Sequence, residues 1–238
     1  AFIEDANSGL ETLTAEDITI PRLKVLQAMS PEVMKSDGKY VEGASAGDII
    51  NTVTGKLYTN DNPLVALPVA YKRLFLEWGP RESGGGLVAQ HEDASILSKT
   101  TKDNMGRDML ENGNYIQTSA THFVLSLNED GSYDSAMIAM AGTQLKKSRT
   151  WNSVMASIKM RSGDKVFTPA SFSHKYVMKT KAESNDRGTW FGWNITLDGP
   201  LGEDEMFFYQ AAKDFASTVG EVNLSQSNDN ESTSEAPF

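Results

Sequence analysis

The sequence predicts a β-rich α+β fold. Three observations predict it: alternating apolar and polar residues dominate from about residue 46 onward, tight-turn signals separate these segments, and only two long stretches carry apolar residues at helical spacing. The 238 residues can bury a sizeable core, as one large domain or two small ones. We expect one domain over 14–219, a loose N-terminus over 1–13 and a disordered acidic tail over 220–238.

The N-terminal part gives the weaker structural signals. Thr14-Ala15-Glu16-Asp17 has the pattern of a helix start with acids in the first turn, and Pro21 limits that helix to about one turn. Residues 22–29 (RLKVLQAM) fit either a short helix or a strand, and Pro31 ends the segment.

The β-texture begins after this segment. Turn residues join several pairs of strand-like runs, and Asn128-Glu129-Asp130-Gly131 is the strongest hairpin signal. Pro68 places the start of the longest run at an edge or a bend. The expected strands cover 47–51, 56–58, 64–78 (as one long strand or two), 121–127, 133–141, 171–180 and 190–197.

Two helices and one insertion complete the prediction. Trp151, Val154 or Met155, and Ile158 recur at helical spacing, which predicts a helix over 144–161. Residues 205–218 predict a second helix. Residues 79–117 are rich in Gly, Ser, Asp and Asn, so we expect a long loop-rich insertion with one helical turn near 93–99.

Composition excludes several classes of site. The chain has no cysteine, which rules out disulfides, thiolate metal sites and a cysteine nucleophile. The three histidines stand far apart, Gly84-Gly85-Gly86 lacks the Lys-Ser/Thr of a phosphate loop, and no nucleophile elbow occurs. We therefore expect no enzyme activity, no metal and no cofactor. A metal-dependent nuclease stays as a minor alternative, because the acidic clusters are better explained by a turn and a helix start.

The chain gives no sign of a membrane protein. No apolar run approaches the roughly 20 residues that cross a bilayer. The start, Ala1-Phe2-Ile3-Glu4-Asp5, lacks the basic and apolar regions of a signal peptide, and its small first residue fits a cytosolic chain without its initiator Met. We expect a cytoplasmic protein with no membrane partner.

The charge is distributed unevenly along the chain. The formal net charge is −10, yet residues 141–193 hold ten Lys or Arg against three acids. Residues 1–140 carry −9 and residues 194–238 carry −8. This asymmetry is typical of a chain that binds a polyanion or carries an acidic tail.

The basic segment also carries many aromatic residues. Single-stranded nucleic acid needs cations along its phosphates and flat faces for its unpaired bases, and each stacked base contributes about 1–3 kcal/mol. We therefore predict a single-stranded nucleic-acid site in this segment. Its predicted contacts are Lys146, Lys147, Arg149, Lys159, Arg161, Lys175, Tyr176, Lys179, Lys181, Arg187, Trp190 and Phe191, with Lys72, Arg73 and Trp78 as outlying contributors.

Alternation within the expected strand 174–181 puts Lys175, Lys179 and Lys181 on one face, opposite Tyr176 and Met178. Three cations on one face repel each other unless an anion lies across them. The alternative is that the aromatic residues are core and the lysines are a solvated surface. We expect Trp151 and Trp193 in the core, and Trp190 and Phe191 to be accessible.

The C-terminus forms a second candidate site, for a protein partner. A terminal Phe238 after Pro237 on an acidic tail can fill a partner's apolar pocket, while Glu231 and Glu235 meet basic residues around the rim. The same acids can compete for the protein's own basic groove.

The acidic tail ending in Pro-Phe resembles the tails of single-stranded DNA-binding proteins of bacteria and their phages. The segments Ile20–Gln27 and Gln144–Ser153 resemble phage proteins described as single-stranded DNA-binding. The resemblance implies an OB-like antiparallel β-barrel with a few added helices, and a tail that recruits replication, recombination or transcription proteins. This tail is less acidic than most of its kind.

We therefore expect a DNA-binding protein with little sequence preference. It would act in phage replication, recombination or transcription, as a homo-oligomer or cooperatively, in the host cytoplasm. The alternative is a phage structural protein, a virion or scaffold component that sets its basic face against acidic neighbours.

Overall fold

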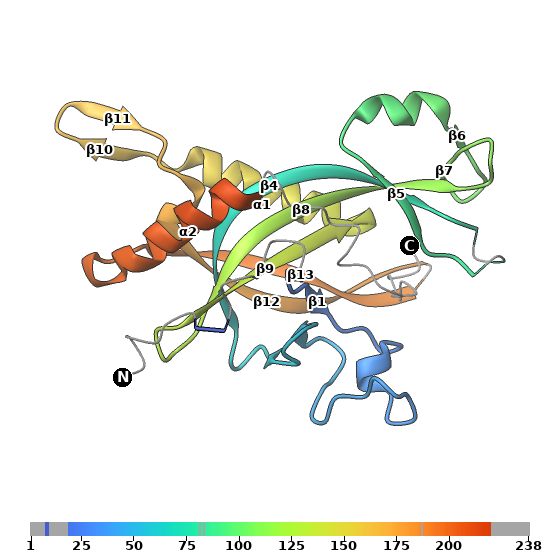
Figure 1. Cartoon of the computed structure of the whole chain (residues 1–238), viewed down its shortest axis with the longest axis horizontal. Coiled ribbons are helices and arrows are strands. Elements are labelled where there is room, and N and C mark those ends of the chain that lie inside the picture. Colours follow the sequence, from blue (N-terminus) through green and yellow to red (C-terminus); the bar gives the residue numbers. More distant parts are fainter. Residues whose placement is uncertain (1–7, 10–18, 81, 83, 187, 220–238) are drawn as a thin grey trace.

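Two long antiparallel strands, β4 (Leu64–Trp78) and β8 (Tyr115–Leu127), run through the centre of the computed structural model (Figure 1). The structure describes residues 8–9, 19–80, 82, 84–186 and 188–219. The two strands pair from Val65–Leu127 to Trp78–Tyr115, with one irregularity between Pro68 and Ala70. The expected strand over 64–78 is thus a single strand, and Pro68 marks its bulge.

Other strands flank this ribbon at its two ends. At one end β12 (His174–Asn185) pairs with β4, β13 (Gly188–Pro200) pairs with β12, and β9 (Tyr133–Ala141) pairs with β8. At the other end β5 (Leu87–His91) pairs with β4, and β7 (Asp108–Met109) joins β8 to β6 (Thr101–Lys102). All these pairs are antiparallel, and the sheet curls into a half-barrel (Figure 1).

A small sheet of β1 (Leu23–Val25), β2 (Ile49–Asn51) and β3 (Leu57–Tyr58) continues the half-barrel beside β9. Arg22 forms an isolated parallel bridge with Met137, and the Met137 amide donates to the Pro21 carbonyl at 2.8 Å. The ambiguous segment 22–29 therefore forms a strand over residues 23–25, in its first half. Its register places Leu23 in the barrel interior, where its side chain is 1% exposed.

Side-chain amides, rather than further strands, bind the open backbone edges of β12 and β13. Gln27 donates from Nε2 to the Phe191 carbonyl and accepts from the Phe191 amide, both at 2.9 Å. Asn60 makes the same pair of bonds to Thr180, at 3.1 and 3.0 Å. An amide side chain carries the same donor and acceptor as a peptide group, so it satisfies an edge residue without a strand.

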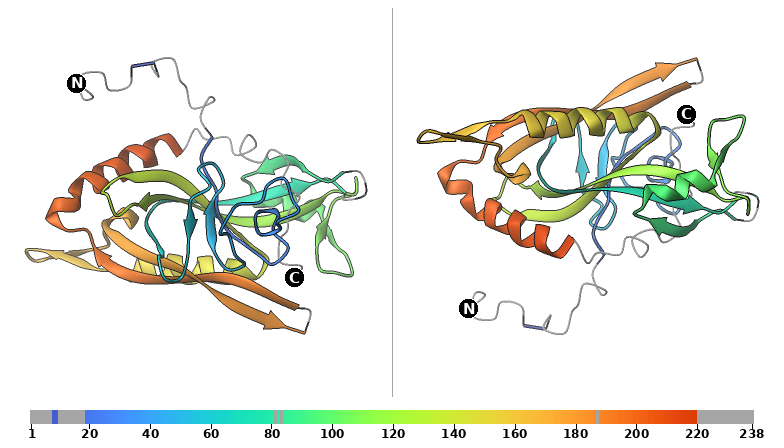
Figure 2. Two further views of the ribbon diagram at one scale, coloured as in Figure 1. Left: turned by 90° about the horizontal axis from the view of Figure 1, so that it is seen from below. Right: turned by 90° about the horizontal axis from the view of Figure 1, so that it is seen from above.

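The two long helices cover opposite sides of the sheet (Figure 2). Alternation along β8 sends Val124 to the inner side and Phe123 and Leu125 to the outer side, so both sides need cover. Helix α1 (Leu145–Ser157) inserts Trp151 on the inner side, and α2 (Met206–Thr218) places Phe208 on the outer side.

Short 3-10 turns connect these elements, and none of the described helices is long and apolar enough to cross a membrane. The turns are η1 (Pro31–Val33), η3 (Ala94–Lys99), η4 (Gly142–Gln144), η5 (Ser171–Ser173) and η6 (Glu203–Glu205). The helical turn expected near 93–99 is confirmed by η3, which Asp93 caps by accepting from the Ser95 amide at 2.8 Å.

The predicted β-rich α+β class is confirmed, and β9 and α2 lie where the sequence places them. The predicted helix over 144–161 is wrong in its last part. Residues 160–167 instead form a hairpin of β10 (Met160–Ser162) and β11 (Lys165–Phe167), because Gly163 adopts φ +59° and turns the chain. The expected helical turn at 14–17, the tail over 220–238 and all but residues 8 and 9 of the N-terminus over 1–13 lie outside the described residues.

Candidate nucleic-acid interface

A groove of about 630 Å³ lies between α1 and β13. Both walls come from the segment that the sequence singles out as basic and aromatic. Helix α1 contributes one face of its surface because residues spaced three and four apart share a side of a helix. The lining residues are Thr143, Lys146, Lys147, Thr150, Trp151, Val154, Tyr176, Glu183, Ser184, Trp190, Trp193, Asn194, Ile195 and Leu197.

Two predicted cations stand on the helical wall of the groove. Lys146 is exposed, whereas Lys147 is half-buried and lies 2.6 Å from a Glu183 oxygen. Both lie in the first turn of α1, where a positive charge opposes the helix dipole. The local cost of two lysines at this helix start is consistent with a site that receives an anion.

Glu183 links the two walls of the groove. Its carboxylate accepts from Lys147 Nζ at 2.6 Å, from Trp190 Nε1 at 3.0 Å and from Gln144 Nε2 at 3.3 Å. Burial works to raise the pKa of Glu183, but these hydrogen bonds together hold the pKa below its usual value. Sequence reasoning missed Glu183, because it counted this acid only against the basic segment.

The floor of the groove is aromatic and buried. The exposed fractions are 2% for Trp151, 1% for Tyr176, 4% for Trp193 and 8% for Trp190. The core positions predicted for Trp151 and Trp193 are confirmed. The accessibility predicted for Trp190 is wrong, because its indole N–H donates to Glu183 on the paired strand, near the turn of the β12–β13 hairpin.

Phe191 is half-buried for a different reason. Its ring packs over Gly47, where a Cβ atom would come within 2.8 Å of the ring, and Gly47 has φ +97°. The backbone of Phe191 is bound by Gln27. Phe191 therefore fastens β13 to the N-terminal sheet and does not line the groove.

Two buried polar atoms in the groove lining have no hydrogen-bond partner within the described part of the chain: Trp151 Nε1 and Tyr176 Oη. Their rings meet edge to face, with centroids 5.6 Å apart. Burial raises the pKa of Tyr176 to about 12, so its hydroxyl keeps its proton. Unpaired buried donors are uncommon and require an explanation, such as a bound water or ion.

A buried histidine positions Trp151 under the groove. The His122 ring stacks on the Trp151 ring with centroids 4.4 Å apart, and His122 Nε2 lies 2.8 Å from Ser148 Oγ. Burial lowers the pKa of His122 to about 3, so the ring is neutral at ordinary pH. The contact fixes the rotation of α1 over β8 and offers no charge to a ligand.

The profile of the Pam3 phage gp34-like protein family matches residues 1–224. The chain belongs to this family. Its membership supports the predicted phage origin and says nothing further about activity. No curated protein and no solved structure matches the chain.

The lysines of β12 alternate as predicted, because Tyr176 and Met178 face the interior and Lys175 and Lys179 are half-buried on the other side. Of the three lysines predicted on this face, Lys175, Lys179 and Lys181, two already lie close to acids of the same chain. Lys175 binds both Glu205 oxygens at 2.6 and 2.8 Å, and Lys181 lies 3.9 Å from Glu183. Among the described residues Lys179 has no ion-pair partner.

The remaining predicted contacts are scattered. Arg149 is exposed on α1 outside the groove lining, Lys159 directly precedes β10, and Arg161 lies on the β10–β11 hairpin. Arg73 is exposed on β4, and Lys72 lies 3.5 Å from Glu92. Arg187 and the predicted tail contacts, Glu231, Glu235, Pro237 and Phe238, lie outside the described residues.

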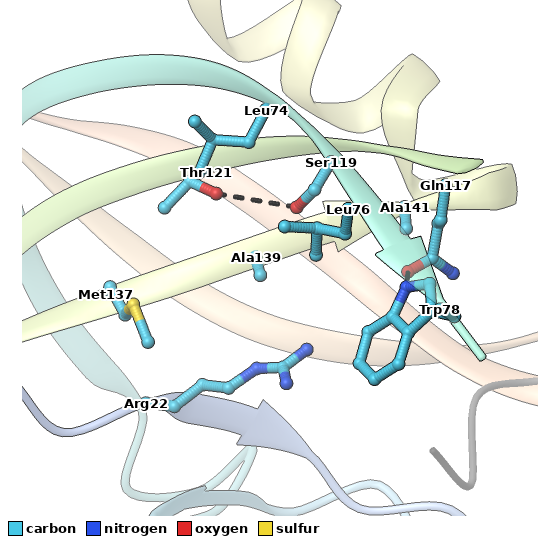
Figure 3. A pocket seen from close by; sticks show the side chains of 10 residues that line it. All are labelled: Arg22, Leu74, Leu76, Trp78, Gln117, Ser119, Thr121, Met137, Ala139 and Ala141. Carbon is cyan, nitrogen blue, oxygen red and sulfur yellow. Dashed lines mark hydrogen bonds between the residues drawn. The ribbon is translucent and has the colours of Figure 1, made fainter. Parts of the chain in front are cut away.

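Trp78 does not belong to the groove either. It is 7% exposed, and its Nε1 donates to Gln117 Oε1 at 3.1 Å. Figure 3 shows it beside a second cavity, toward which Arg22 extends. That cavity holds about 30 Å³, room for about two water molecules and far too little for a nucleotide. No group of three or more potential metal ligands is found among the residues described.

Proposed function

We propose that this phage protein binds single-stranded DNA, without strong sequence preference, in the groove between α1 and β13. The observation that carries the proposal is the groove itself. It brings predicted cations, Lys146 and Lys147, over an aromatic floor that includes Trp151 and Tyr176.

The chemistry of the groove suits an unpaired strand better than a duplex. Cations on one wall can follow phosphates, and the edges of the aromatic rings below can contact bases that no partner strand covers. Thr143, Thr150 and Asn194 add neutral hydrogen-bonding groups, which hold a strand without selecting a base. In duplex DNA the bases are paired and stacked on one another, so they are not available to contact this floor.

We further propose that the half-barrel is related to the OB fold and that the protein binds DNA as an oligomer or cooperatively. We also propose that its tail recruits replication, recombination or transcription proteins. The curled antiparallel sheet supports the first of these, since OB-type proteins bind strands on a curved sheet.

The test is a titration with labelled oligo-dT of about 30 nucleotides, longer than the roughly 4–16 nucleotides covered by one such domain, against a duplex of equal length. We expect tight, salt-sensitive binding of the single strand only. Lys146→Ala/Lys147→Ala should weaken it and lower the salt slope by up to about 1.4, since each phosphate contact contributes about 0.7. The matched control is Lys99→Ala/Lys102→Ala in the β5–β7 region.

Two results would reject the proposal. One is the absence of binding at low salt, even after deletion of residues 220–238. The other is equal loss of affinity in the groove variant and in the control variant. Large ordered assemblies formed without nucleic acid would instead favour the structural-protein alternative.

A further inference from the structure

The β10–β11 hairpin projects from the body of the protein beyond the end of α1 (Figure 1). Every residue from 159 to 168 is exposed. The hairpin nevertheless carries large apolar side chains, with exposed fractions of 39% for Met160, 57% for Val166 and 44% for Phe167. Because these side chains are exposed, packing within this fold does not explain them. An isolated two-stranded hairpin is itself only marginally stable in water.

The register gives each face of the hairpin both an apolar and a cationic group. Met160 is paired with Phe167, and both share a face with Lys165 at the tip. Arg161 is paired with Val166 on the opposite face. Three cations stand against a single acid, Asp164, over 159–168, in a chain whose net charge is −10.

The hairpin also continues the line of the groove. Val154, in the last part of α1, lines the groove, α1 ends at Ser157, and β10 begins at Met160. A strand that leaves the groove at this end therefore meets the hairpin next. Interleaved cations and an aromatic ring are what an unpaired, negatively charged strand requires.

We propose that the β10–β11 hairpin is a second contact for single-stranded DNA, in which Phe167 stacks on a base that leaves the groove while Lys165, on the same face, holds an adjoining phosphate. This inference rests on the proposed function. It adds a specific consequence: the protein gains affinity from nucleotides beyond those that fill the groove.

The experiment compares oligo-dT of about 6 and about 20 nucleotides, which bracket the roughly 4–16 nucleotides that single-strand-binding domains cover. Phe167→Ala should weaken binding of the long strand about 5-fold or more, the lower limit for one stacked base, and leave the short strand unchanged. Lys165→Ala should lower the salt slope for the long strand by up to about 0.7. Val88→Ala and Lys99→Ala, equally exposed in β5 and η3, are the controls.

Each outcome has one meaning. If the wild-type protein binds the long strand and the hairpin variants bind it equally well, the hairpin inference is wrong and the groove proposal stands. If the wild-type protein binds neither strand, the proposed function fails and the inference fails with it. If the hairpin variants change the oligomeric state without DNA, measured by light scattering, the hairpin is a contact between subunits and the inference is overturned. Unchanged urea denaturation would show that the variants fold.

Discussion

Glu183→Gln is the substitution whose effect follows most directly from the geometry of the groove. The Glu183 carboxylate lies 2.6 Å from Lys147 Nζ, the position that a DNA phosphate would take. A phosphate oxygen about 2.8 Å from the same Nζ lies at most about 5.4 Å from the Glu183 oxygen. Like charges at that distance repel by about 0.8 kcal/mol at the dielectric constant of water and by about 3 kcal/mol at a value of 20.

Removal of this charge should therefore tighten binding of single-stranded DNA by about 4-fold or more. Gln keeps one acceptor oxygen, for Trp190 Nε1 and Gln144 Nε2, and places an NH2 group where the other oxygen accepted from Lys147, so Lys147 is released from its ion pair. The loss of charge-assisted hydrogen bonds should lower the free energy of unfolding by about 1 kcal/mol. Affinity and stability thus move in opposite directions, which a folding defect would not produce.

The assay is fluorescence anisotropy with labelled oligo-dT at several salt concentrations, with urea denaturation of the same samples. Glu203→Gln, an exposed acid in η6, gives the same change in net charge away from the groove. The reasoning is refuted if Glu183→Gln leaves the affinity unchanged or weakens it. It is also refuted if Glu203→Gln tightens binding by the same factor, since the effect would then be one of net charge.

Three further predictions concern the fold around the groove. Tyr176→Phe removes an unpaired buried hydroxyl, so urea denaturation should show equal or higher stability, whereas Tyr58→Phe breaks a buried 2.7 Å bond and should cost about 1–3 kcal/mol. Gln27→Ala should cost about 1–3 kcal/mol and speed amide exchange at Phe191; protection equal to wild type would contradict this. Burial lowers the pKa of His122 to about 3, so on acidification this histidine is protonated in the unfolded chain before it is protonated in the folded protein. The stability that depends on the neutral ring is therefore intact above about pH 6.5. Below that it is lost at about 1.4 kcal/mol per pH unit, a slope that His122→Phe should reduce in urea titrations.

Local patterns predicted the local elements well. The alternation in 133–141 and the turn before it are confirmed by β9, and the helical spacing in 205–218 by α2. The spacing of Trp151, Val154 and Ile158 extended the predicted α1 too far, because Ile158 fits the helical period but follows the last helical residue. Gly163 marks the turn of the hairpin over 160–167, and the strand that leads into this turn requires an earlier end of the helix.

The closure of the half-barrel could not be predicted in this way. Gln27 and Phe191 are 164 positions apart, and periodicity contains no information on contacts at that range. The same holds for Glu183, whose partner Lys147 comes from another element. Trp190 was predicted to be accessible from its place after a polar turn, but the acid that binds its indole N–H lies on the paired strand. Residue types thus located the candidate site, while tertiary contacts decided which side chains belong to it.

The most direct test of the central claim is to map where single-stranded DNA touches the protein. The full chain would be crosslinked by ultraviolet light to an oligo-dT that carries 5-iodouracil, and the modified peptides identified by mass spectrometry. We predict adducts in 143–154 and 190–197, the walls of the groove, with further adducts in 159–168. Adducts confined to the β5–β7 region, or no adduct under conditions in which the DNA is bound, would contradict the account.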